Sequence, residues 1–315
     1  PRIAAPSDLF GEERRNSAGL DLSNEQRLAS LAAALLAGSA APLKAVPLLG
    51  DGPAEGIARP VLNPADHRDQ VGVVEEATPE IVARAMEIAQ GAAPIWQSTP
   101  PEERAQCLSR AADLMEARMP ALIGIIVREA GKSFPNAIGE VREAVDFLRY
   151  YGAQLKGWSN DSHRPLGPVV CISPWNFPLA IFTGQVAAAL AAGNAVLAKP
   201  AEETPLIAHA AVEILREAGV PPGAVQLLPG GGEVGAALVG DTRTRGVMFT
   251  GSTEVARLIQ GQLAERLSPE GGVIPLIAET GGQNAMIVDS SALAEQVVAD
   301  VLSSAFDSAG QRCSA

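Results

Sequence analysis

The sequence predicts an α/β fold built around a parallel sheet that helices cover on both faces. From residue 165 onward, short apolar runs alternate with helical patterns, and the runs are expected strands at 169–172, 195–198, 225–228 and 246–249. The segments that carry helical periodicity are 178–192, 205–219, 232–240 and 253–263. Continuous apolar strands separated by helices are typical of a parallel sheet buried on both faces. Because such sheets bind ligands beyond the carboxyl ends of their strands, the pattern predicts a dinucleotide site there.

The elements before this sheet are expected to be mostly helical. Residues 1–24 are polar and turn-rich, a helix is expected over 25–36, and residues 42–64 are rich in proline and glycine and should form loop and short strand. A strand is expected at 71–74. The further helices are expected at 79–89, with Thr78 as N-cap, and at 101–119, 120–130 and 136–156.

The end of the chain is expected to begin a second unit. The apolar run 274–278 predicts a fifth strand that leads into Glu279. A strand at 285–288 and a helix at 291–306 should follow. The apolar side chains of that helix need a partner surface, since an exposed apolar face of this size is unusual on a monomer.

Composition excludes several classes of protein. The chain of 315 residues is 47% hydrophobic and 4% aromatic, as expected for a helix-rich α/β protein with one large or two ordinary domains. Its net charge of −12 argues against nucleic acid or an anionic membrane as a partner. No apolar run reaches the roughly 20 residues that cross a bilayer, and no signal-peptide core is visible.

The cysteines and histidines show no metal-ligand spacing. The three cysteines, Cys107, Cys171 and Cys313, form no CxxC pair, so no zinc site and no disulfide framework is expected. A working thiol would suit a reducing compartment, and we therefore expect a cytoplasmic protein.

The candidate chemistry lies between Glu279 and the end of the chain. Cys313 has small and polar neighbours, which suit a nucleophile that a substrate must approach closely. A thiol with an ordinary pKa of about 8.5 needs help to ionise, and Glu279 could supply it directly or by activating a water. An isolated cysteine is more commonly a small buried residue, so the interpretation depends on the surrounding motifs.

Five motifs in order resemble the aldehyde dehydrogenase superfamily over residues 60–315. They are Pro174-Trp175-Asn176-Phe177-Pro178, Lys199-Pro200-Ala201-Glu202, Phe249-Thr250-Gly251-Ser252, Glu279-Thr280-Gly281-Gly282 and Gly310-Gln311-Arg312-Cys313. The resemblance implies an arm with one helix over 1–59 and a Rossmann-like NAD-binding domain over 60–278, which is discontinuous in the full family fold. Residues 279–315 would begin an α/β catalytic domain that is incomplete here.

The resemblance also implies a covalent mechanism. The Cys313 thiolate would attack an aldehyde, hydride would pass to NAD, and Glu279 would activate the water that hydrolyses the thioester. The Asn176 amide and the backbone N–H of Cys313 would form the oxyanion hole. From spacing alone, Asn176 would more simply stabilise its own turn.

The family's cofactor residues map onto eleven positions of this chain. They are Ile172, Ser173, Pro174, Trp175, Lys199, Glu202, Phe249, Gly251, Ser252, Thr280 and Gly281. Lys199 and Glu202 would bind the adenosine ribose, which favours NAD over NADP; without the resemblance they would be a solvated ion pair. The pyrophosphate would lie near Gly251 and Ser252, at a helix N-terminus. Many relatives have glycine where this chain has Ala256.

A second, shorter resemblance concerns the substrate. Residues 15–25, RNSAGLDLSNE, resemble the connector of the proline utilization A family of bifunctional enzymes. It implies oxidation of L-glutamate-γ-semialdehyde to glutamate and a covalently linked proline dehydrogenase domain, which would carry FAD outside this chain. Ser314 would then bond the substrate carboxylate, Glu143 would pair with its ammonium, and Phe177 would line the substrate site.

Two other interpretations stay open at this stage. One is a succinate- or betaine-type aldehyde dehydrogenase; the other is a non-catalytic dinucleotide-binding or assembly fragment. The sequence leaves undecided whether the natural chain extends beyond residues 1 and 315. We expect a homo-oligomer for the complete protein, and we expect residues 1–315 alone to lack activity and to associate.

Overall fold

The computed structural model describes residues 3–38 and 43–315, and its centre is a seven-stranded sheet. Its strands, in spatial order, are β10 (Leu276–Glu279), β9 (Gly246–Thr250), β6 (Pro168–Ile172), β7 (Ala195–Lys199), β8 (Val225–Leu227), β2 (Leu48–Leu49) and β3 (Gly52–Pro53). The pairings from β10 to β8 are parallel, and β2 joins β8 antiparallel. The predicted α/β fold with a parallel sheet is therefore confirmed.

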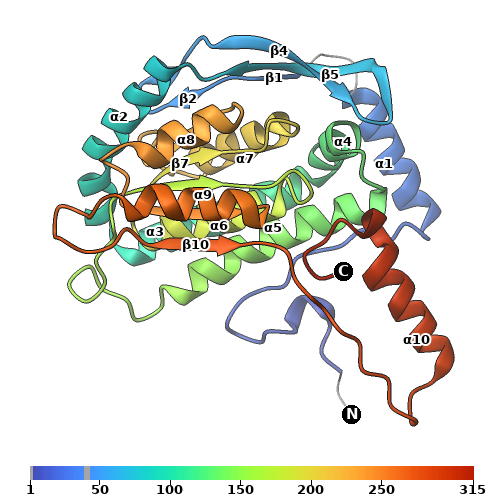
Figure 1. Cartoon of the computed structure of the whole chain (residues 1–315). Coiled ribbons are helices and arrows are strands. Elements are labelled where there is room, and N and C mark those ends of the chain that lie inside the picture. Colours follow the sequence, from blue (N-terminus) through green and yellow to red (C-terminus); the bar gives the residue numbers. More distant parts are fainter. Residues whose placement is uncertain (1–2, 39–42) are drawn as a thin grey trace.

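Helices cover both faces of this sheet (Figure 1). One face carries α3 (Pro101–Ala117), α5 (Phe134–Gln154), α6 (Ala180–Ala191) and α7 (Pro205–Glu217); the other carries α2 (Pro79–Ser98), α8 (Gly232–Gly240) and α9 (Thr253–Ala264). Along β6, Val169 and Cys171 face the apolar core beneath α3, α5, α6 and α7, whereas Val170 and Ile172 face the core beneath α2, α8 and α9. This alternation buries both faces, which explains why the strands read as continuous apolar runs.

A second, three-stranded sheet lies beside the first (Figure 1). Its β4 (Ile57–Asn63) and β5 (Asp66–Glu76) form an antiparallel hairpin, and β1 (Leu43–Ala45) pairs with β5 in parallel. Most of β4 is exposed, and only Val61 of that strand is buried. The sequence predicted loop and short strand over 42–64 and a strand at 71–74. The full hairpin was not predicted, because Arg59 and Pro60 interrupt the apolar residues of β4 and residues 66–70 of β5 are polar.

The remaining helices follow the predicted order with changed ends. They are α1 (Glu25–Gly38) and α4 (Met119–Ala130), with the short helical turns η1 (Pro6–Asp8), η2 (Leu302–Phe306) and η3 (Asp307–Gly310). Thr78 caps α2 as predicted, accepting from the N–H of Ile81 at 3.4 Å. However, α2 continues past the predicted end at residue 89, through Pro94, to Ser98. No helix of residues 3–38 and 43–315 is long and apolar enough to cross a membrane.

The last part of the chain differs most from the prediction. The strand expected at 285–288 is wrong: residues 281–289 form no regular element, and Ile287 is 94% exposed. The helix expected at 291–306 is the shorter α10 (Ala294–Val301), which continues into η2 and has no buried residue. Figure 1 shows α10 projecting away from the layered part of the molecule. A strand needs a neighbour for its backbone hydrogen bonds, and no described strand lies beside this segment.

Candidate active site

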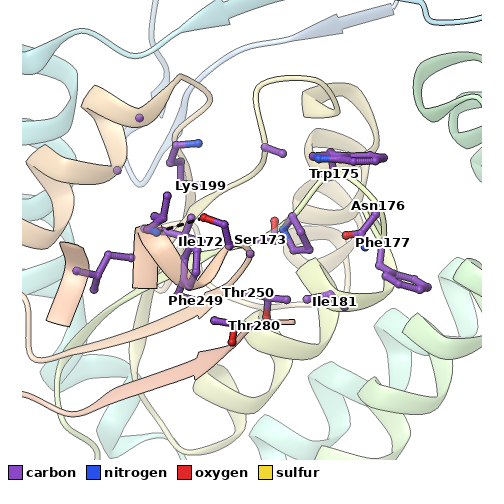
Figure 2. A pocket seen from close by; sticks show the side chains of 18 of the residues that line it. Ile172, Ser173, Trp175, Asn176, Phe177, Ile181, Lys199, Phe249, Thr250 and Thr280 are labelled. Carbon is purple, nitrogen blue, oxygen red and sulfur yellow. Dashed lines mark hydrogen bonds between the residues drawn. The ribbon is translucent and has the colours of Figure 1, made fainter. Parts of the chain in front are cut away.

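A cleft of about 750 Å³ opens at the carboxyl ends of β6, β7 and β9. The helices α8 and α9 and residues 310–313 form its other sides. All eleven predicted cofactor residues line it: Ile172, Ser173, Pro174, Trp175, Lys199, Glu202, Phe249, Gly251, Ser252, Thr280 and Gly281. Asn176, Phe177 and Cys313 line the same cleft. Figure 2 shows Lys199 at one side of the cleft and Trp175, Asn176 and Phe177 at the other.

The strand ends are tied together beneath the cleft. The side-chain amide of Gln185, in α6, donates to the carbonyl oxygen of Ile172 at 3.2 Å and to Thr250 Oγ1 at 3.0 Å. These bonds join the ends of β6 and β9, so the loops that follow the two strands begin from a fixed position. Ser173 Oγ, beside them, is buried and has no hydrogen-bond partner among the described residues. A polar ligand atom in the cleft could satisfy it, because buried hydroxyl groups are normally hydrogen-bonded.

The N-terminus of α9 faces the cleft. Ser252 caps this helix, since its side chain accepts from the N–H of Val255 at 3.2 Å. The free N–H groups and the dipole of a helix N-terminus favour an anion. Gly251 permits the close turn that precedes the helix, because a Cβ there would lie 2.6 Å from Cζ of Phe249. This geometry suits a pyrophosphate near Gly251 and Ser252.

Lys199 lines the cleft from the end of β7, where its side chain is buried. Its ammonium donates to the carbonyl oxygen of Pro200 at 2.8 Å and lies 3.9 Å from Glu202 Oε2. Burial lowers the pKa of Lys199, and the carboxylates of Glu202, Glu203, Glu233 and Glu76 oppose that shift. The Glu202 side chain is 55% exposed. A buried ammonium beside an exposed carboxylate is not the fully solvated pair that the bare sequence allowed.

Asn176 lies against the segment that carries the cysteine. Its side-chain amide donates to the carbonyl oxygen of Gln311 at 2.9 Å. Cys313 is exposed, and its own carbonyl oxygen accepts from the Asn284 side chain at 2.7 Å. The fold therefore brings Asn176 and Cys313 to one wall of the cleft, 137 positions apart in the sequence (313 − 176).

Three predicted site residues do not line the cleft. Glu279 is the exposed last residue of β10, and its carbonyl oxygen accepts from the N–H of Gly251 at 3.1 Å. The chain nevertheless passes close to the cysteine three residues later, since a Cβ on Gly282 would lie 2.6 Å from the carbonyl oxygen of Cys313. Ser314 follows the cysteine but does not contribute to the wall of the cleft.

Glu143, the third of them, lies on α5 within a group of charged side chains. Burial and the charge of Glu140 raise the pKa of Glu143, whereas Lys132 and Arg312 oppose the rise. Arg312 is itself ion-paired with Asp307. This pairing gives Arg312 a structural role in holding the segment before Cys313.

The sequence reasoning missed Lys132 and Glu140. The Lys132 ammonium lies 2.7 Å from Glu140 Oε1, and the two side chains are 7% and 1% exposed. The same ammonium lies 4.5 Å from the centre of the Phe177 ring. Burial raises the pKa of Glu140, while Lys132 opposes the rise. The available signal was the position of Glu140, a carboxylate on the otherwise apolar face of α5 that also carries Ala137 and Val141.

Metal ligands are not grouped in the described part of the chain. No set of three or more His, Cys, Asp or Glu among residues 3–38 and 43–315 could hold a metal ion. The side chains that do converge are a thiol, an amide and a buried ammonium, placed around a cleft with a helix N-terminus.

The chain is similar to known proteins. Residues 53–315 match the model of the aldehyde dehydrogenase family. The chain is 68% identical over 317 aligned residues to the bifunctional protein PutA of Escherichia coli strain K12. This alignment covers 100% of this chain and 24% of that protein. It is 40% identical over 268 residues to a 1-pyrroline-5-carboxylate dehydrogenase of Bacillus cytotoxicus, covering 81% of this chain and 52% of the relative.

A solved structure shows the same similarity. The 1-pyrroline-5-carboxylate dehydrogenase from Thermus with bound NAD matches at a TM-score of 0.89 and 35% identity, over 96% of this chain and 62% of that one. The chain thus spans about a quarter of the length of the PutA relative and about half of the Bacillus relative.

Proposed function

The chain belongs to the aldehyde dehydrogenase family, and we propose that it carries the cofactor cleft and the nucleophile of an NAD-dependent L-glutamate-γ-semialdehyde dehydrogenase. The observation that carries the proposal is the cleft itself, which Cys313, Asn176 and all eleven expected cofactor residues line. The resemblance predicted from five short motifs is confirmed by the family match and by the PutA relatives.

The cleft fits the chemistry of NAD. The α9 N-terminus at Ser252 would hold the pyrophosphate, and Lys199 and Glu202 would hold the adenosine ribose. The unpartnered hydroxyl of Ser173 offers a further contact. NAD, when bound, accepts a hydride. The NAD-bound Thermus relative supports this choice of cofactor.

Cys313 is the proposed nucleophile. Its exposed thiol would lose a proton and attack the aldehyde carbon, which forms a thiohemiacetal on this side chain. The side-chain N–H of Asn176 now bonds the Gln311 carbonyl oxygen, two residues before the thiol. Turning this N–H toward the new oxyanion, together with the backbone N–H of Cys313, would stabilise the tetrahedral adduct.

Glu279 would then act on the thioester that remains on Cys313 once a hydride has left the thiohemiacetal carbon for the bound cofactor. It lies at the exposed end of β10, where water reaches its carboxylate. As a general base it would take a proton from a water that attacks the thioester carbon, which releases the carboxylic acid and the Cys313 thiol. Because Glu279 lies just outside the wall of the cleft, it could accept a proton from water without blocking the cofactor.

The substrate assignment rests on the names of the relatives and on three residues. 1-Pyrroline-5-carboxylate is the cyclic imine of L-glutamate-γ-semialdehyde, so the printed names of the Bacillus and Thermus relatives point to this substrate. Glu143 would pair with the substrate ammonium, Ser314 would bond its carboxylate, and Phe177 would line the site. A second active domain for proline oxidation with FAD, a homo-oligomeric assembly and a cytoplasmic location belong to the same proposal. The name of the bifunctional PutA relative supports the second activity.

The test is a substrate panel on the complete natural protein that contains this sequence. NADH formation is followed with glutamate semialdehyde, succinate semialdehyde, betaine aldehyde and a plain aliphatic aldehyde at equal concentration. We expect the highest kcat/KM for glutamate semialdehyde. A higher value for any of the other three aldehydes would refute glutamate semialdehyde as the preferred substrate, and no NADH with any of the four would refute the dehydrogenase assignment.

A further inference from the structure

Glu140, buried in α5, accepts hydrogen bonds from the first turn of another helix. Its Oε2 accepts from the N–H of Leu179 at 3.2 Å and from that of Ala180 at 2.9 Å, where α6 begins. Its Oε1 accepts from Lys132 at 2.7 Å. One carboxylate therefore joins the start of α6 to the body of α5 and to the connection between α4 and α5.

Glu129, near the end of α4, makes the same kind of contact with a different helix. Its Oε1 accepts from the N–H of Leu206 at 2.6 Å and its Oε2 from that of Ile207 at 3.0 Å, where α7 begins. The residue is 3% exposed. Both oxygens accept from backbone N–H groups of α7, so this side chain binds only the start of that helix.

Neither helix caps itself. The N-cap residues of α6 and α7, Leu179 and Thr204, make no side-chain capping bond, and the Thr204 hydroxyl is buried without a partner among the described residues. By contrast, Ser133 and Ser252 cap α5 and α9 locally. A local serine satisfies the free N–H groups of a helix without burying a charge. A glutamate that reaches across from another helix does something more, because it also fixes where the helix begins relative to that neighbour.

The two helices follow the two loops of the proposed site. Residues 173–178, between β6 and α6, carry the proposed cofactor residues Ser173 to Trp175 at the end that β6 fixes, and Asn176 and Phe177 at the end that leads into α6. Residues 200–204, between β7 and α7, follow Lys199 and carry Glu202. Each loop has its first end fixed by a strand of the central sheet and its second end fixed by a buried glutamate. The cleft lies between these two loops (Figure 2).

The helices that supply the glutamates are well anchored. In α4, Leu122, Ile123 and Ile126 are buried in the main core, and in α5, Val141 and Val145 are buried in the same core. A buried, closely packed helix resists displacement, so it is a firm support for a loop that must hold a reacting group.

We infer that Glu140 and Glu129 are positioning residues with separate duties: Glu140 places the Asn176 loop for the chemical step, and Glu129 places the Lys199–Glu202 loop for cofactor affinity. The division rests on the proposed function, which assigns the two loops their roles. Neither glutamate lines the cleft, so each acts through the loop that it fixes.

The two glutamates are matched controls for one another in the complete natural protein. Glu140→Ala should lower kcat at saturating NAD by about 10–100-fold, because a displacement of about 1 Å at a reacting group costs on this scale, and should leave the Kd of NAD within about twofold. Glu129→Ala should raise the Kd of NAD about tenfold, by calorimetry, and leave kcat at saturating NAD within about threefold.

Glutamine variants provide the same test if an alanine variant does not fold. Glu140→Gln retains an oxygen for Leu179 and Ala180 but turns an N–H₂ toward Lys132. Glu129→Gln turns one N–H₂ toward a helix N–H. Each should shift the same parameter as its alanine variant, by a smaller factor, in protein whose circular dichroism is unchanged.

Amide hydrogen exchange separates this inference from the proposed function. Glu140→Ala should speed exchange in residues 174–183 and not in 200–210, and Glu129→Ala should do the reverse, whether or not the protein oxidises aldehydes. If exchange changes in these local segments but the protein has no dehydrogenase activity, the proposed function would be refuted and the anchoring role of the two glutamates supported. Equal effects of both variants on kcat and on the Kd of NAD, or unchanged exchange in an active enzyme, would overturn the inference.

Discussion

Replacing Glu202 with glutamine should weaken the preference for NAD over NADP. The 2′-phosphate of NADP carries a charge of about −2, and it would occupy the place of the ribose hydroxyl that Glu202 is proposed to bind. Two unit charges 4 Å apart interact by about 1 kcal/mol in water, and this value applies because the Glu202 side chain is 55% exposed. A doubly charged phosphate beside this carboxylate therefore loses about 2 kcal/mol, which is roughly 30-fold in affinity.

Lys199 is present in the parent and in the variant, so its attraction for the phosphate does not alter the difference between them. Its ammonium donates to the Pro200 carbonyl oxygen, and burial lowers its pKa. Contact between the carboxylate and the phosphate would bring the charges to about 4 Å, which is shorter than the Debye length of about 8 Å at physiological ionic strength, so salt would screen the interaction only in part.

Calorimetric titration of the complete natural protein with NAD and NADP measures the effect. The parent should bind NAD at least tenfold more tightly, and Glu202→Gln should remove most of that difference. Glu233→Gln is the matched control, since this carboxylate also acts on Lys199 but does not line the cleft; it should keep most of the preference. Equal affinity of the parent for both cofactors, or an unchanged ratio in Glu202→Gln, would refute the ribose assignment.

Three further predictions concern catalysis, selectivity and assembly. Glu279→Gln should keep the burst of hydride transfer and lower steady turnover by about 10²–10⁴-fold in stopped-flow assays; loss of the burst would instead make Glu279 the base for the thiol. Glu143→Ala should reduce the preference for an aldehyde with ammonium and carboxylate over a plain one by roughly 1–3 kcal/mol, and an unchanged ratio of kcat/KM would remove Glu143 from the site. Residues 1–315 alone should associate in size-exclusion chromatography, because α10 has no buried face; a monodisperse monomer with dehydrogenase activity would contradict this.

The central sheet could be predicted from the sequence because each of its main strands is marked by its own apolar residues. Strands such as β6 and β7 are buried on both faces, so each appears as a short apolar run between helices. The β4–β5 hairpin was predicted only in part, because Arg59 and Pro60 interrupt the apolar residues of β4 and the register is irregular near Val61. The end of α2 was also missed: Pro94 lies on the exposed side of the helix, where solvent can satisfy the carbonyl group that the proline leaves free.

The strand predicted at 285–288 illustrates a different limit. Its composition is typical of a strand, but a strand forms only where another strand offers backbone partners. The pattern of Ala285 to Val288 contains no information about whether such a partner is present. In the described structure it is not, and Met286, Ile287 and Val288 are exposed.

For the site, the motifs predicted which residues line the cleft but not what supports them. Asn176, Lys199 and Cys313 belong to short motifs that sequence spacing reveals. Glu140 and Glu129 belong to no such motif, because their partners lie 39–40 and 77–78 residues away. Only the packing of α4 and α5 against α6 and α7 shows why a carboxylate occurs on an apolar helix face.

Covalent catalysis is tested most directly by the Cys313→Ala variant of the complete natural protein, with Cys107→Ala as a control thiol outside the cleft. NADH formation from glutamate semialdehyde and the Kd of NAD are measured for both. We expect no aldehyde oxidation by Cys313→Ala, a Kd of NAD within about twofold of the parent, and normal turnover by Cys107→Ala. Substantial turnover by Cys313→Ala would contradict covalent catalysis at this cysteine.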